Sequence, residues 1–268
     1  MKTVLGIDAA WTATQPSGVA LVVDDGSGWQ LRRVAASYDH FLSDGSEHSL
    51  LVGRPLGSLA DAGALLARAE TLAGRSVDLV AIDMPLSLRP VTSRRPADNK
   101  VSAAYGARHC STHSPSAERP GRISDDLRGS FQKLGYSLAT VQPSVPALIE
   151  VYPHPALVEL MTAPRRLPYK QSRVASYWPT ELPSARRERL LEVWQSIVRS
   201  LDRKIAGVAN LLPILSGMSK AYQLKAFEDM LDAVICCWVG TCVLDGRATA
   251  FGDETSAIWI PRPLDPQD

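Results

Sequence analysis

The chain has 268 residues, of which 45% are hydrophobic and 21% are charged, and its formal net charge is +1. This length is enough for one large domain with a sizeable core, or for a domain that carries an insertion. A nearly neutral chain has no overall electrostatic field of the kind that marks a nucleic-acid-binding or membrane-binding protein, so any basic surface must be local.

Three features of the sequence bear on the cellular compartment. Residues 1–4 run directly into an apolar segment and lack the layout of a signal peptide. The longest apolar stretch, 233–244, is shorter than the roughly 20 residues that a membrane span needs. The four cysteines include no CxxC pair, which is typical of a reducing compartment rather than of a disulfide framework. We therefore expect a soluble cytoplasmic protein without a membrane partner.

The first part of the chain predicts an antiparallel meander. Residues 3–8, 18–23 and 29–36 have the composition of short strands, and the segments between them are rich in turn-forming Pro, Gly, Ser and Asp. Strands joined by such short connections pair antiparallel.

A helix and two further strands are predicted in the middle of the chain. Residues 56–73 have apolar side chains at helical spacing and end at Gly74, a typical C-cap. Residues 77–82 form a continuous apolar run, which is typical of a strand buried on both faces. The segment 147–152 is predicted as a fifth strand.

The C-terminal part predicts two helices. One covers 184–201 and has a strongly charged face; the other covers 224–244 and is apolar on most sides, so we expect it to be buried. An apolar patch follows at 257–260. Three meandering strands, a helix, two strands and further helices predict an α/β fold with a mixed sheet.

Regular patterns are lost between residues 84 and 146, where seven of the 19 prolines lie. This segment predicts long loops with one or two short helices, and a loop of this length inside a compact domain is usually functional. We therefore expect one domain over residues 1–268, in which 84–146 is a loop-rich insertion at the rim of the functional site.

Several aspartates stand where a buried strand or helix should carry an aliphatic side chain. Asp8 ends the first strand, Asp83 ends the fourth, and Asp229 and Asp232 share one face of the last helix. A carboxylate at the end of a buried strand is costly to desolvate unless a cation or hydrogen-bond donors compensate it. Mg²⁺ and Mn²⁺ take oxygen ligands and are the usual partners of clustered carboxylates. The pattern therefore predicts metal-dependent phosphate chemistry.

Two basic clusters could serve such a site. Residues 89–124 contain seven Lys or Arg against two acidic residues, and a second cluster without acids consists of Arg165, Arg166, Lys170 and Arg173. Arginine can bind phosphate through two hydrogen bonds, so these residues suit a phosphate-bearing substrate. Solvated loops that keep the chain soluble explain the same composition equally well.

The chain resembles the RNase H-like superfamily, especially its Holliday-junction resolvase branch, and most closely a family of predicted RNase H-like nucleases. The motifs that carry the resemblance are, in order, Gly6-Ile7-Asp8, Ile82-Asp83-Met84-Pro85-Leu86, Arg95-x-x-Asp98, Tyr105-Gly106-Ala107-Arg108, Glu150-Val151-Tyr152-Pro153-His154-Pro155, Pro168-Tyr169-Lys170 and the segment from Asp229 to Ala233.

This resemblance implies an RNase H-like mixed five-stranded sheet flanked by helices, and a nuclease that uses Mg²⁺ or Mn²⁺ to cut DNA or RNA. By resemblance, Asp8, Asp83 and Asp232 would be metal ligands, and Asp229 and Glu150 would complete the catalytic set. In such sites two ions roughly 4 Å apart activate water and stabilise the leaving oxygen.

The expected contacts to substrate phosphate are Arg108, Lys170 and Arg95, and we expect Arg108 to point towards the carboxylates. Whether the protein is a homodimer stays open.

Two other functions stay open. An ATP-binding phosphotransferase of the actin and sugar-kinase type shares the fold, but there the first Asp precedes a Gly-rich hairpin, whereas Ala9-Ala10-Trp11 follows Asp8 here. A non-catalytic nucleic-acid-binding protein on the same scaffold is the other alternative. A zinc site at His109-Cys110-x-x-His113 is not expected, because the motif lacks a second pair of ligands at finger spacing.

Overall fold

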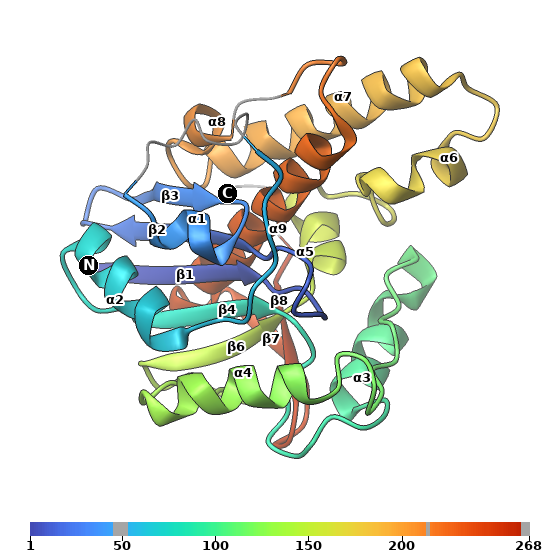
Figure 1. Ribbon diagram of the computed structural model, residues 1–268. Helices are drawn as coiled ribbons and strands as arrows, with labels where there is room; N and C mark the ends of the chain where they lie inside the picture. The colour runs from blue at the N-terminus through green and yellow to red at the C-terminus, as the bar shows by residue number, and fades with distance from the viewer. Residues whose placement is uncertain (45–52, 213–214, 264–268) are drawn as a thin grey trace.

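The computed structural model describes residues 1–44, 53–212 and 215–263. Its centre is a mixed β-sheet of eight strands in the order β3-β2-β1-β4-β6-β8-β7, with β5 paired to β6 (Figure 1). The strands are, in chain order, β1 (Lys2–Asp8), β2 (Gly18–Asp24), β3 (Trp29–Ala35), β4 (Leu79–Asp83), β5 (Ser137–Leu138), β6 (Ala147–Val151), β7 (Ala248–Gly252) and β8 (Ala257–Pro261).

The predicted meander is confirmed. β1 pairs antiparallel with β2, and β2 with β3. β4 lies parallel to β1 on its other side, β6 lies parallel to β4, and β8 lies parallel to β6. At the edge opposite β3, β7 pairs antiparallel with β8. The mixed α/β class is therefore confirmed.

The expected number of five strands is too low for the described part of the chain. The missing strands are β5, which has two residues, and the hairpin of β7 and β8. β7 has the sequence Ala-Thr-Ala-Phe-Gly, whose small residues and half-exposed positions give no clear strand pattern. The apolar patch at 257–260 is the fully buried strand β8, and its pairing with β6, more than 100 residues earlier in the chain, left no local signal.

Helices cover both faces of the sheet (Figure 1). They are α1 (Tyr38–Leu42), α2 (Ala62–Ala73), α3 (Pro96–Tyr105), α4 (Arg122–Lys133), α5 (Pro153–Leu160), α6 (Val174–Tyr177), α7 (Pro183–Asp202), α8 (Val208–Leu211) and α9 (Ala221–Leu244), with single 3₁₀ turns at η2 (Gly106–Arg108) and η3 (Gln171–Arg173).

Alternating side chains of the strands divide the core into two layers. Val4 and Ala81 face α9, α7 and α5, whereas Leu5, Ile7 and Ile82 face α1, α2 and α4. This alternation follows from the two-residue period of a strand. Burial of apolar surface in both layers is the main source of stability.

The predicted helix at 56–73 begins six residues late, at Ala62, because Asp61 caps it: the Asp61 carboxylate accepts a hydrogen bond of 2.9 Å from the backbone N–H of Ala64. The segment 84–146 is more regular than expected, since it forms the ten-residue α3 and the twelve-residue α4. α3 packs on β7 and β8, and α4 packs on α2 and β5. Among the described residues, no helix is long and apolar enough to cross a membrane.

Candidate active site

The candidate site begins where two neighbouring parallel strands end. Asp8 and Asp83 are register partners, each the last residue of its strand, β1 and β4. Adjacent strands lie about 4.8 Å apart, so both side chains leave the sheet at the same edge. Each residue is half-buried. The predicted juxtaposition of these two carboxylates is therefore present in the fold.

Helix α9 brings two further carboxylates to this edge. Asp229 and Asp232 lie about one turn apart on its buried face, with 2% and 0% of their surface exposed. The helix approaches β2 closely because Gly18 has no side chain: a Cβ there would lie 2.0 Å from the carbonyl oxygen of Asp229. Gly6 plays the same role on β1, where a Cβ would lie 2.3 Å from the carbonyl oxygen of Ala233. These two glycines set the distance between α9 and the sheet.

The four aspartates lie near enough to influence one another's pKa values, although burial is the larger cause of each shift. Burial, and then the charges of Asp232 and Asp229, raise the pKa of Asp8 well above its ordinary value. Burial, followed by the charge of Asp232, raises the pKa of Asp83 to about 8. Burial also raises the pKa of Asp229, to about 6, although the positive charge of Lys225 offsets part of this effect. Like charges that share a site have this effect.

Two lysines compensate the cluster. The ammonium of Lys170 contacts Asp232 and lies 3.6 Å from Glu228, and that of Lys225 contacts Asp229 and lies 3.5 Å from Glu228. Burial alone would lower the pKa of Lys170, but the charges of Asp232 and its other acidic neighbours raise it well above its ordinary value. Both ammonium groups therefore stay charged beside the carboxylates.

The segment that carries Lys170 is anchored on both sides. The hydroxyl of the fully buried Tyr169 donates a 2.8 Å hydrogen bond to Asp232, and Trp194 of α7 donates one of the same length to the carbonyl of Tyr169. Glu228 accepts a hydrogen bond of 2.5 Å from the backbone N–H of Gln171. Each oxygen of Asp232 thus has a partner, and the lysine is held in place by backbone and ring contacts.

Glu150 lies one register position behind Asp83, opposite Ile82, and is held in a buried ion-pair network. Its carboxylate accepts two hydrogen bonds from Arg95, of 2.6 and 2.7 Å, and a third of 2.7 Å from the backbone N–H of Leu86. Arg95 also binds Asp98 at 2.9 and 3.0 Å, and both partners are buried. This network ties the loop after β4 to β6.

Arg95 is therefore not available to a substrate in this structure. Its side chain is only 6% exposed, and its guanidinium is turned towards Glu150 and Asp98. Glu150 lines the same cavity as Asp83, as expected, but its carboxylate is paired with Arg95, and its catalytic role stays a prediction. The sequence missed this arrangement because Arg95 and Glu150 are 55 residues apart.

Arg108 does not point towards the carboxylates, as the sequence led us to expect. Its guanidinium donates a 2.6 Å hydrogen bond to Glu159 of α5 and a 2.7 Å bond to the carbonyl of Ala163. It also lies over the ring of Tyr105, 5.6 Å from its centroid. One third of the side chain stays exposed, so Arg108 is an ion-pair partner at the surface.

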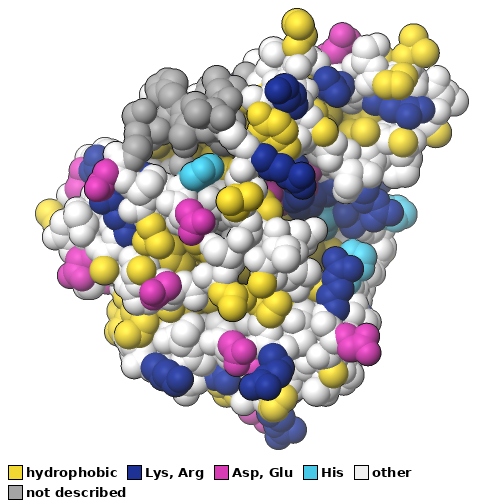
Figure 2. Space-filling model, in the orientation of Figure 1, with side chains coloured by type: hydrophobic (Ala, Val, Ile, Leu, Met, Phe, Trp, Pro, Cys, Tyr) yellow, Lys and Arg dark blue, Asp and Glu magenta, His cyan; other side chains and the backbone are white. Residues whose placement is uncertain are grey.

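Other basic groups surround His154. Burial, and after it the charges of Arg166, Lys170 and other basic neighbours, lower the pKa of His154 well below its ordinary value. Figure 2 shows Lys, Arg and His side chains gathered at the right of the molecule, between the arm formed by α6 and α7 and the lower part that contains α3. Within the second basic cluster of the sequence, Arg165 and Arg173 are exposed and Arg166 is half-buried.

Two cavities give access to the carboxylates. Asp8, Asp229 and Lys225 line one of about 220 Å³, together with Gln15 and Tyr222. Asp83 lines a smaller one of about 50 Å³, which also borders Tyr152 and His113. Two different cavities therefore reach residues of the cluster.

The sequence was compared with those of known protein families. Residues 6–257 match the family described as "Protein of unknown function (DUF429)". The chain belongs to this family. The match covers every carboxylate and lysine of the cluster, from Asp8 to Asp232. No curated protein and no solved structure matched the chain.

The DUF429 site has a donor set that suits a hard divalent cation, since its carboxylate oxygens are the ligands that Mg²⁺ and Mn²⁺ prefer. Within residues 1–44, 53–212 and 215–263, however, no three Asp, Glu, His or Cys side chains stand close enough to hold an ion as they are placed. Lys170 and Lys225 contact the oxygens instead. Burial, and after it the charges of neighbouring carboxylates, raise the pKa of Asp8 and of Asp83, and a cation that displaced the lysine contacts would offset both causes.

Sequence reasoning overlooked two members of this DUF429 site. Glu228 is 3% exposed, and its carboxylate lies within 3.6 Å of the ammonium of Lys170 and 3.5 Å of that of Lys225. Lys225 lies four residues before Asp229, a spacing that places the two on one helix face. That spacing was the available signal for Lys225; none distinguished Glu228.

Proposed function

We propose that this protein is a metal-dependent nuclease with an RNase H-like fold, which hydrolyses phosphodiester bonds in DNA or RNA. The observation that carries the proposal is the register pair of Asp8 and Asp83, over which α9 places Asp229 and Asp232. Carboxylates gathered at one sheet edge, with cavities leading to them, suit the binding of cations and a phosphate together.

The topology supports the RNase H-like assignment. Within the larger sheet, β3-β2-β1-β4-β6 form a unit in which an antiparallel meander is extended by two strands parallel to β1. This is the mixed five-stranded arrangement that the sequence resemblance implies, with the β7–β8 hairpin added at one edge. Fold alone does not determine activity, so the argument for a nuclease rests on the carboxylate cluster.

Asp8, Asp83 and Asp232 would hold Mg²⁺ or Mn²⁺. When bound, such ions activate water for attack on phosphorus and stabilise the leaving oxygen. Lys225 is half exposed and lines the same cavity as Asp8, so its ammonium can contact a phosphate that enters there. Lys170 holds Asp232 in position. Arg165 and Arg173, which are exposed, would supply sequence-independent attraction for a nucleic-acid backbone.

The phosphotransferase alternative finds less support. The connection between β1 and β2 contains no glycine from Ala9 to Ser17, and a 3.0 Å hydrogen bond from the N–H of Ala10 to the Ser17 hydroxyl closes it. A phosphate-binding hairpin needs glycines, so that backbone N–H groups can approach the phosphates closely. The experiment below distinguishes both alternatives from a nuclease: a phosphotransferase would use ATP, and a non-catalytic protein would bind nucleic acid without cutting it.

The test is an incubation of purified protein with single-stranded, duplex and branched DNA and RNA, in Mn²⁺, in Mg²⁺ and in EDTA. We expect cleavage that needs the metal and is lost in Asp8→Asn, which keeps the side-chain shape but removes the charge. Glu188→Gln, at an exposed position on α7, is the matched control and should cleave normally.

Three results would contradict the proposal. The first is that the folded protein cuts no substrate in either metal. The second is that Asp8→Asn cleaves as fast as wild type, which would assign the activity to a contaminating nuclease. Hydrolysis of ATP in place of nucleic acid would instead support the phosphotransferase.

A further inference from the structure

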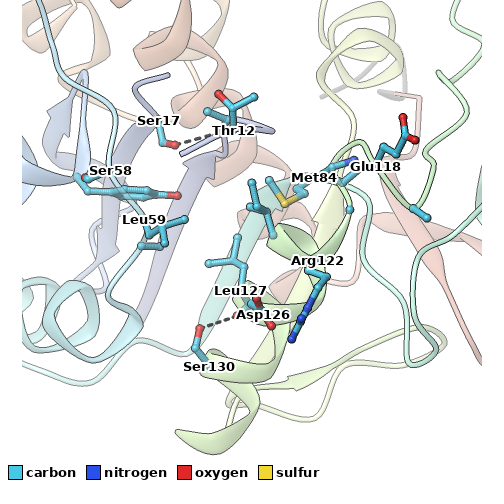
Figure 3. A pocket seen from close by; sticks show the side chains of 17 residues that line it. Thr12, Ser17, Ser58, Leu59, Met84, Glu118, Arg122, Asp126, Leu127 and Ser130 are labelled. Atoms are coloured by element: carbon cyan, nitrogen blue, oxygen red, sulfur yellow. Dashed lines mark hydrogen bonds between the residues drawn. The ribbon is translucent and has the colours of Figure 1, made fainter. Parts of the chain in front are cut away.

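A third cavity, of about 530 Å³, lies next to the candidate site but is lined by none of its carboxylates (Figure 3). It is bounded by the loop after β1, by residues 58–60 and by the first turns of α4. Ligand-binding pockets usually measure roughly 300–1,000 Å³, so this cavity has the size of a small organic ligand or of one nucleotide unit.

The cavity starts where the two catalytic strands end. It shares Ala10 with the cavity that contains Asp8, and it shares Met84 with the cavity that contains Asp83. Ala10 is two residues beyond Asp8, and Met84 directly follows Asp83. A ligand that fills this cavity therefore lies beside whatever group is held between the carboxylates.

Its walls combine apolar faces with a polar edge. Leu59, Met84 and Leu127 provide the apolar part, and Ser58 and Ser130 provide hydroxyl groups (Figure 3). Such walls suit a flat ring system that has apolar faces and hydrogen-bonding edges.

The aromatic wall is fixed before any ligand arrives. Tyr38 is 5% exposed and lines the cavity. Its hydroxyl is hydrogen-bonded to Ser17, which in turn accepts the hydrogen bond from Ala10. A preformed aromatic surface reduces the entropy that binding would otherwise cost.

The charges in the cavity disfavour an anion. Its lining includes the carboxylates of Glu118 and Asp126 against a single cation, Arg122. A free phosphate would meet net negative charge there, whereas at the carboxylate cluster the cations of the proposed nuclease, together with the half-exposed Lys225, would attract it. The uncharged part of a nucleotide thus suits this cavity, and its phosphate suits the neighbouring site.

We propose that this cavity binds an unpaired nucleobase of the substrate strand, next to the phosphodiester held at the carboxylates. The proposal rests on the nuclease function and narrows its substrate class to single-stranded or locally unpaired nucleic acid, because a paired base cannot leave its stack to enter a pocket without first being unpaired. Stacking on the cavity walls tolerates different bases, so the contribution is largely independent of sequence.

The test compares a single-stranded DNA oligonucleotide with a fully abasic strand of the same length, both bound in Ca²⁺, an oxygen-binding ion with looser geometry than Mg²⁺, and a gel of each sample checks that the strand is intact. Ser130→Phe fills the cavity from α4, and its expected effect is an affinity for the intact strand that is weaker by about tenfold, within the range that stacking of one base contributes. The abasic strand should bind wild type and Ser130→Phe alike. Lys133→Phe, at an exposed position of the same helix, should change neither affinity.

A second variant covers the case in which Ser130→Phe does not fold. Ser58→Phe narrows the cavity from the loop on the other side, where a larger side chain is tolerated more easily, and should have the same effect. The inference is overturned if neither strand binds, or if the variants weaken both strands equally or neither strand.

These outcomes are separate from those of the nuclease assay. Base-dependent binding without hydrolysis would contradict the nuclease but support the pocket. Metal-dependent hydrolysis with equal affinity for both strands would do the reverse.

Discussion

The ammonium group of Lys170 contacts Asp232, a carboxylate on α9 that is completely buried. The two residues are 62 positions apart, and Tyr169 binds the other oxygen of the same carboxylate. A positive charge from a distant part of the chain thereby compensates one of the clustered carboxylates. This arrangement leads to predictions on stability, on metal binding and on substrate contacts.

Loss of the Lys170 ammonium should destabilise the protein without metal. In Lys170→Met, Asp232 keeps its bond to Tyr169 but loses its cation, and we expect the free energy of unfolding to fall by about 3 kcal/mol, the lower end of the range for breaking a buried ion pair. Urea denaturation in EDTA measures the loss. Lys133→Met, at an exposed position, should stay within about 0.5 kcal/mol of wild type. An equally small effect for Lys170→Met would show that Asp232 does not need this partner.

Metal should stabilise the native protein. Because an ion binds the folded carboxylates and not the unfolded chain, Mn²⁺ at a hundred times its Kd should add about 2.7 kcal/mol to the free energy of unfolding. Thermal melts in Mn²⁺ and in EDTA measure the effect. Asp83→Asn should abolish it, while Glu188→Gln should preserve it. A Tm of wild type that is the same in both conditions would contradict a site formed by the protein alone.

The metal-free protein should lose stability as the pH rises. The pKa of Asp83 is about 8 in the folded state and 3.8 ordinarily, so the folded protein binds this proton more tightly than the unfolded chain does. Its contribution is fully present below about pH 4 and is lost as the pH rises to about 8, with a slope of at most about 1.4 kcal/mol per pH unit. Asp8 acts in the same direction.

Urea denaturation in EDTA at several pH values in this window measures the slope. Asp83→Asn should reduce it, because the amide does not titrate, and Glu188→Gln should leave it unchanged. A slope that is unaltered in Asp83→Asn would show that other groups dominate the pH dependence.

Arg95 should prove structural. Arg95→Met leaves Glu150 and Asp98 without their buried cation, and the free energy of unfolding should fall by about 3–5 kcal/mol. Adding Glu150→Gln should recover part of this loss, since the uncompensated charge is then removed. Denaturation of the single and double variants checks this. Normal stability of Arg95→Met combined with weaker nucleic-acid binding would restore its predicted role as a substrate contact.

The salt dependence of binding should separate two arginines. Arg173 is exposed beside the site, so Arg173→Ala should weaken binding of nucleic acid and reduce the slope of log K against log salt by about 1. Arg108 is already paired with Glu159, and Arg108→Ala should leave the slope unchanged. Fluorescence anisotropy across a salt titration measures both. Equal slopes for Arg173→Ala and wild type would remove Arg173 from the interface.

Local patterns in the sequence determined the central elements. The apolar run before Asp83, the short turns of the meander and the apolar surroundings of Asp232 each lie within one segment, and each follows from the period or composition of a single element. Once β1 and β4 are parallel neighbours, Asp8 and Asp83 must leave the same sheet edge. The juxtaposition of these carboxylates could therefore be derived from the sequence.

Only the tertiary structure decided which charges meet. Arg95 and Lys170 were both expected to face substrate, but one is paired with Glu150 in the interior and the other with Asp232 in the cluster. The β7–β8 hairpin, the cavity beside Ala10 and the close approach of α9 at Gly18 also stayed hidden. Ion pairs, cavities and strand neighbours join residues that are far apart in the chain, and their energies depend on burial and on distances that no local pattern contains.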